Sequence, residues 1–133
     1  MAIKITKTPE NGYKYVVQSE RGKSDAFTVY IKPINTRTLL GLEDRMVQRK
    51  GDDVFIAQGE FAFRIAQFGI LGWENMLDEK NKPVAFELDA DGVATEKTIA
   101  HIPADLLTEI SGVVNAITRN PSSIFEVFFP TED

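Results

Sequence analysis

The sequence predicts an α+β domain in which an amino-terminal antiparallel three-stranded meander packs against about three helices. Before Pro33, apolar and polar residues alternate in three short runs, which is the period-2 pattern of strands with one buried face. After Pro33, apolar residues recur at helical spacing instead. Because neither pattern buries its apolar face alone, we expect sheet and helices to share one core in a single domain spanning residues 1–133.

The meander is expected within residues 1–32. The alternating runs are residues 3–6, 13–18 and 27–32. Pro9-Glu10-Asn11-Gly12 separates the first two runs, and residues 20–25 separate the second from the third. Asn and Gly tolerate the positive φ angles of tight turns, so these short connections predict neighbouring antiparallel strands.

Residues 33–121 are expected to be mainly helical. Asn35 or Thr36 can cap the first helix, and Asp52 or Asp53 suits the positive amino-terminal end of the second. Asn120-Pro121 is a stop signal for the last helix. The expected helices span residues 36–49, 53–71 and 103–119.

Two glycines and two turn sequences shape the region between the second and third helices. Gly69 and Gly72 stand where a glycine cap would end the second helix. Lys82-Pro83 favours an extended entry into residues 84–86, and Asp89-Ala90-Asp91-Gly92 is a turn signal. A small hairpin is therefore expected within residues 84–99. The letters show no internal repeat.

Composition excludes several classes of function. The chain has no cysteine and one histidine, so neither a thiolate site nor a histidine metal cluster can be built. Its net charge is −5 and its 15 basic residues are scattered, which argues against nucleic acid as a partner. No apolar run approaches the roughly 20 residues of a membrane span, and the amino terminus lacks a signal-peptide pattern. We expect a cytoplasmic protein with no membrane partner.

The segment Glu87-Leu88-Asp89-Ala90-Asp91-Gly92 partly matches a calcium-binding loop. Oxygen-bearing side chains stand at its positions 1, 3 and 5, and glycine stands at position 6. The twelfth position is Thr98 rather than the bidentate glutamate of such loops. We favour a solvated turn and keep a small calcium-binding module as an alternative.

The remaining chemistry-bearing residues do not form a catalytic pattern. The adjacent acids Asp52-Asp53 and Asp78-Glu79 suit a helix start and a polar surface better than an acid–base pair, because neighbouring side chains on a turn seldom converge. His101 lacks partners for a triad and is expected to be partly buried or to cap a helix. Gly69-Ile70-Leu71-Gly72 lacks the lysine of a phosphate loop. We therefore expect no enzyme activity and no cofactor.

Three segments carry a resemblance to a known family. They are Gly72-Trp73 at the end of an apolar helix pattern, an acidic turn leading to Lys82-Pro83-Val84-Ala85-Phe86, and Ile102-Pro103-Ala104-Asp105-Leu106-Leu107 at the start of the last helix. In these segments the chain resembles the small tail assembly chaperones of long-tailed bacteriophages, over residues 27–120. Asn81 stands where that family often has glycine, and residues 88–99 look like an insertion.

The resemblance implies a non-enzymatic protein of the host cytoplasm during phage assembly. Such a protein coats the long, hydrophobic tape measure protein, helps tail tube protein subunits polymerise around it, and is absent from the finished virion. A structural tail or neck protein of a phage or prophage that stays in the virion is the alternative.

Two places are candidate contact surfaces for a partner. Residues 122–133 follow the last helix as an apolar tail, and an exposed aromatic cluster of this kind would require a partner, either another copy of the chain or the tape measure protein. Docking of the tail on its own core is equally open. Trp73 can contact a partner as well, although an aromatic anchor closing the core is the favoured role. The candidate contact residues are Trp73, Phe125, Val127, Phe128 and Phe129.

Overall fold

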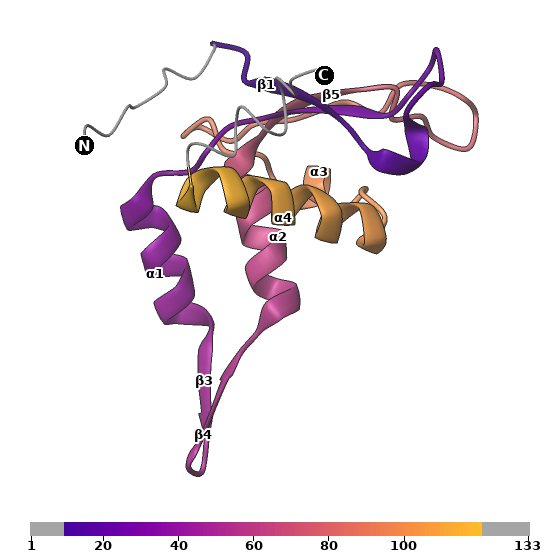
Figure 1. The fold of residues 1–133 in the computed structure, drawn as a ribbon. Coiled ribbons are helices and arrows are strands. Elements are labelled where there is room, and N and C mark those ends of the chain that lie inside the picture. Colours follow the sequence, from indigo (N-terminus) through magenta and orange to yellow (C-terminus); the bar gives the residue numbers. More distant parts are fainter. Residues whose placement is uncertain (1–9, 121–133) are drawn as a thin grey trace, which may run out of the picture.

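The computed structural model describes residues 10–120, and it has the predicted α+β class (Figure 1). Two antiparallel sheets and four α-helices make up this part of the chain. In chain order the elements are β1 (Tyr13–Val16), the short 3-10 helix η1 (Gln18–Glu20), β2 (Thr28–Ile31), α1 (Thr36–Met46), β3 (Val47–Lys50), β4 (Asp53–Ile56), α2 (Gln58–Gly69), β5 (Ile70–Glu74), α3 (Glu96–Ile99) and α4 (Ala104–Arg119).

The main sheet has three antiparallel strands in the order β1-β2-β5. The strands expected at 13–18 and 27–32 are confirmed as β1 and β2, and Tyr15 pairs with Val29 at their centre. The third strand is β5, which reaches the sheet from beyond α2, with an irregularity in its register next to Tyr30. Residues 3–6, where a meander strand was expected, lie outside the described residues. The sheet is therefore antiparallel and three-stranded, but in the described part it is not a simple meander.

The helices cover one face of this sheet. In Figure 1, α4 runs beneath the strands and crosses α2, while α1 lies to one side. The alternating strand residues that point toward the helices are buried, as period 2 predicted. The fully buried large side chains are Val17, Val29, Ile31, Leu42, Ile65, Ile70, Ile99, Ile110, Val114 and Ile117.

Polar contacts fix both ends of α4 against the sheet and its connections. Near its start, Glu109 accepts hydrogen bonds from the Tyr15 hydroxyl at 2.6 Å and from the Gln18 amide at 2.9 Å. Near its end, the Thr118 hydroxyl accepts a 3.0 Å hydrogen bond from the Ile34 amide. Burial and the neighbouring carboxylate raise the pKa of Tyr15 to about 12.

The first and last helices agree well with the sequence prediction. Asn35 caps α1 through a 2.8 Å hydrogen bond from the Arg37 amide to its side chain. Pro103 is the residue before the first helical position of α4, and Asn120 follows its last. The first helix is shorter than expected, however, because it ends at Met46 rather than at 49.

The helix predicted over 53–71 is wrong at both ends. Residues 53–56 form β4, which pairs with β3 as a hairpin, and residues 70–74 form β5. Gly51, with a φ of 64°, lies in the hairpin turn, where Asp52 also lies instead of capping a helix. Figure 1 shows this hairpin projecting away from the main sheet.

The hairpin expected within residues 84–99 is present only in part. Its turn exists and is closed by one isolated bridge between Leu88 and Ala94. The return segment does not continue as a strand, because Thr95 caps the short helix α3 by accepting a 3.2 Å hydrogen bond from the Thr98 amide. Within residues 10–120, no helix is both long and apolar enough to cross a membrane.

Candidate functional site

Trp73 connects the sheet to the segment that follows it. It lies on β5 opposite Val29, and its indole Nε1 donates a 2.9 Å hydrogen bond to the backbone carbonyl of Val84. Its ring meets Phe86 edge-on, with centroids 5.0 Å apart and planes at 82°, and Phe27 lies 6.5 Å away. Aromatic pairs favour this geometry. Trp73 therefore ties residues 84–86 to the sheet while part of its ring stays accessible.

Residues 78–83 form a turn that Asp78 organises. Its carboxylate Oδ1 accepts hydrogen bonds from the amides of Lys80 at 2.8 Å and Lys82 at 3.0 Å. Asn81 has a φ of 60°, the left-handed conformation that glycine usually supplies. Asn81 thus adopts the backbone conformation that the turn needs.

The same turn recurs eleven positions later, around Asp89. Asp89 Oδ1 accepts from the amides of Asp91 at 2.8 Å and Val93 at 3.0 Å, and Gly92 has a φ of 77° at the position equivalent to Asn81. Each turn is closed by an isolated bridge one residue outside it, and each bridge begins at a leucine, Leu77 or Leu88. The two segments share too few letters for the sequence to reveal this structural repeat.

In the second turn, Asp89, which matches a ligand position of the calcium-loop pattern, accepts hydrogen bonds from the backbone of the turn itself. Asp89 Oδ1 accepts from two backbone amides of its own turn, and the hydroxyl of Thr98, the twelfth position, lies 2.7 Å from that of Thr95. Across residues 10–120 there is no group of three acidic, histidine or cysteine side chains that could hold a metal ion. This geometry favours the solvated turn over the calcium module.

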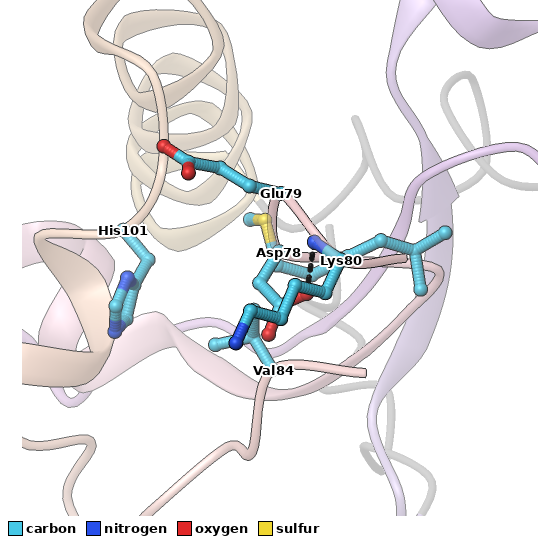
Figure 2. A pocket seen from close by; sticks show the side chains of 7 residues that line it. Asp78, Glu79, Lys80, Val84 and His101 are labelled. Carbon is cyan, nitrogen blue, oxygen red and sulfur yellow. Dashed lines mark hydrogen bonds between the residues drawn. The ribbon is translucent and has the colours of Figure 1, made fainter. Parts of the chain in front are cut away.

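A shallow pocket of about 520 Å³ opens beside the first turn (Figure 2). Met76, Leu77 and Val84 supply its apolar lining, and Figure 2 shows His101 on one side with Lys80 and the Asp78 turn on the other. His101 was expected to be partly buried or to cap a helix; it is exposed, so the first alternative is wrong. It follows Ala100, the C-cap of α3, and its backbone amide donates to the Thr98 carbonyl in that helix.

The predicted contact residues divide between described and undescribed parts of the chain. Trp73 lies on β5 as discussed above. The tail residues Phe125, Val127, Phe128 and Phe129 lie outside the described residues. Tyr30 was not singled out from the sequence, because its pairing with β5 depends on a strand that was predicted as helix.

Comparisons of the chain with protein-family models, with curated proteins and with solved structures found no significant match.

Proposed function

We propose that this protein is a non-enzymatic tail assembly chaperone of a long-tailed bacteriophage or prophage. In this role it binds the tape measure protein in the host cytoplasm and assists assembly of the tail tube protein around it. The proposal rests on the resemblance of residues 72–86 and 102–107 to that family.

One observation about the structure supports the proposal. Within residues 72–86, the part of the resemblance that includes Trp73 forms one connected unit: Trp73 contacts Val84 and Phe86, and the Asp78 turn lies between them in the chain. Asn81, the departure from the family pattern, adopts the required positive φ. These contacts hold Trp73, the Asp78 turn and residues 84–86 together in the fold.

The Asp78 turn of this unit and the equivalent turn at Asp89, which lies outside it, expose apolar side chains that a hydrophobic partner can use. Leu77 and Leu88 are each 49% exposed, although Leu is a residue that proteins usually bury. Together with the pocket beside Leu77, they give the surface an apolar character that a coat on a hydrophobic polypeptide requires.

Co-expression with the tape measure protein encoded in the same genome tests the proposal. We expect a stable, stoichiometric complex that co-purifies, and we expect the chain to be absent from purified virions. Capture should fall when Leu77 and Leu88 are both changed to Asp. Leu40→Asp is the matched control, because Leu40 on α1 is 50% exposed.

The alternatives predict other results. A structural tail or neck protein would be found in purified virions at a fixed copy number. Absence of any complex with the tape measure protein, together with that finding, would replace the chaperone proposal with the structural one.

A further inference from the structure

A second hollow, beside the paired strands β2 and β5, has a different chemistry from the pocket beside Leu77. Its volume is about 530 Å³, and it opens where β2 and β5 pair. Tyr30, Trp73, Leu71 and Leu88 form its apolar and aromatic walls. Glu10 and Glu74 are the charged residues that line it, and no lysine or arginine of the described chain does so.

Gly72 forms part of this hollow, and the fold does not require glycine there. Its φ is not positive, and a Cβ built on it would meet nothing closer than the Tyr30 ring at 3.9 Å, an ordinary contact. At Gly12, by contrast, φ is 80° and a Cβ would lie 2.8 Å from the Ile31 carbonyl oxygen. At Gly69 a Cβ would lie 2.5 Å from Val114. Backbone strain and close packing explain those two glycines but not Gly72.

The absence of a side chain at Gly72 has one clear consequence, which is that the hollow stays open. A larger residue would project from β5 beside the face of Tyr30, its partner in the strand register. Tyr30 is held in place by a 2.5 Å hydrogen bond from its hydroxyl to Glu74. That hydrogen bond raises the pKa of Tyr30 above its ordinary value.

We propose that this hollow binds a polypeptide segment in which a lysine or arginine stands next to an apolar side chain. The apolar residue would lie against Leu71, Leu88 and the accessible part of Trp73. The cation would lie over the Tyr30 ring and between the two carboxylates, where aromatic faces and negative charge both attract it. This inference deepens the proposed function and rests on it for the partner's identity: the segment belongs to the tape measure protein.

Charge separates this occupant from the chain's own carboxyl-terminal run. Residues 124–129 carry no basic side chain, and Glu132 and Asp133 follow them. An acidic rim would repel such a segment. The amino-terminal run contains Lys4 between Ile3 and Ile5, with Lys7 further on, so it has the required chemistry and must be tested as a competitor.

Trp73 is the single tryptophan of the chain, so its fluorescence reports directly on the hollow. The probe is a short peptide of leucine and arginine, titrated into the full-length protein beside a matched peptide with glutamate in place of arginine. We expect a saturable change of Trp73 emission with the arginine peptide alone. Gly72→Leu should weaken binding about tenfold by filling the hollow, and Glu74→Gln about threefold by removing one charge while keeping an acceptor for Tyr30.

Two matched variants control for the effects of adding a leucine or removing a negative charge elsewhere on the protein. Gly112→Leu places the same side chain in open space on α4, and Glu79→Gln removes the same charge beside the other pocket. Both should bind the peptide as the natural chain does. Equal binding of the glutamate peptide, no saturable change, or full binding by Gly72→Leu would overturn the proposal. So would tighter binding by a Lys4→Gln, Lys7→Gln variant, since the chain's own lysines would then be the occupant.

Capture of the tape measure protein by the same variants separates the two proposals. If the peptide binds in the hollow but no tape measure complex forms, the proposed function is wrong, and the inference that the hollow binds a basic and apolar peptide is retained. If the complex forms and Gly72→Leu captures as much as the natural chain, the hollow fails as the docking site and the chaperone function stands.

Discussion

Gly69, the last residue of α2, lies so close to Val114 of α4 that a Cβ at position 69 would come within 2.5 Å of Val114 Cγ1. Both residues are buried, so neither helix can move away without opening the core. The contact explains why glycine stands here, where the sequence suggested only a helix cap. Gly69 sets the closest approach of the two helices that cross beneath the sheet.

Gly69→Ala should therefore destabilise the fold by about 1 to 3 kcal/mol, the usual cost of overpacking a core. Chemical denaturation measures this loss. Val114→Ala alone should also destabilise, by leaving a void. The double variant should be more stable than the sum of the two losses predicts, because the smaller residue at 114 makes room for the methyl group at 69. Simple additivity would show that the two positions do not contact each other.

The hydrogen bond from Tyr15 to Glu109 predicts a loss of stability at alkaline pH. The pKa of Tyr15 is raised from 10.0 to about 12, so the folded state holds this proton more tightly than the unfolded state. The resulting stabilisation is complete below pH 10 and is lost as the pH rises through about 12. Tyr15→Phe should lower stability at neutral pH by about 1 to 3 kcal/mol and flatten this alkaline decline. Thermal melts of both proteins across that pH range test this prediction. If stability falls with pH in the Tyr15→Phe variant as steeply as in the natural chain, the decline does not come from Tyr15.

The sequence predicted the elements whose signals are local. Asn35 at the start of α1 and Pro103 with Asn120 around α4 mark their helices through capping chemistry that neighbouring residues determine. The helix prediction over residues 53–71 failed at its start because residues 53–56 pair with the neighbouring strand β3 across the turn at Gly51, and at its end because residues 70–71 belong to a strand that pairs with the distant β2. Residues 70–74 continue the apolar pattern of α2, but β2 recruits them as a third strand, and burial against β2 outweighs helix propensity.

The candidate site was predictable only in outline. Trp73 and the Asp78 turn could be singled out because their spacing and turn chemistry are visible in the letters. The hollow at Tyr30 and Gly72 could not be, since these residues are far apart in sequence and meet only through the strand register. The repeat of the turn at Asp89 was hidden for a different reason: hydrogen bonds to the backbone define it, and most side chains within it differ.

The two equivalent turns predict matched effects at their positive-φ positions. Asn81→Ala and Gly92→Ala should each destabilise the fold by about 1 to 2 kcal/mol. Alanine has a Cβ, unlike glycine, and lacks the short polar side chain by which asparagine tolerates the left-handed conformation. Nothing lies within 4 Å of a Cβ at Gly92, so strain alone would cause its loss. Asn81→Gly should be neutral or mildly stabilising. Denaturant titrations of the three variants test this, and a large loss for Asn81→Gly would mean that the asparagine side chain, not its backbone, matters.

Core truncations distinguish the buried faces of the two crossing helices. Ile110 on α4 is 0% exposed, and Ile110→Ala should cost about 2 to 5 kcal/mol. Phe61 on α2, four residues before Ile65, is only partly buried, so Phe61→Ala should cost less than Ile110→Ala. Unfolding free energies of the two variants give the comparison. A near-zero loss at Ile110 would show that α4 does not present this face to the core.

The carboxyl-terminal residues Phe125, Val127, Phe128 and Phe129 give the last prediction, which concerns association. We expect the aromatic tail to mediate contact with another copy of the chain or with the tape measure protein, by adding a strand or by inserting its rings into a groove. α4 is tied to the rest of the fold by Glu109 and Thr118, upstream of the tail. A chain ending at Pro121 should therefore keep its far-ultraviolet spectrum and most of its melting temperature.

The same truncation should lower the mass of any oligomer or abolish capture of a tape measure fragment, as measured by light scattering and co-purification. Replacing Phe125, Phe128 and Phe129 by Ser in the full-length chain is the matched comparison, because it keeps the chain length and removes only the rings. If the truncated chain unfolds, the tail belongs to the core. Association would then be tested at the surfaces around Leu77 and Leu88, whose side chains are each 49% exposed.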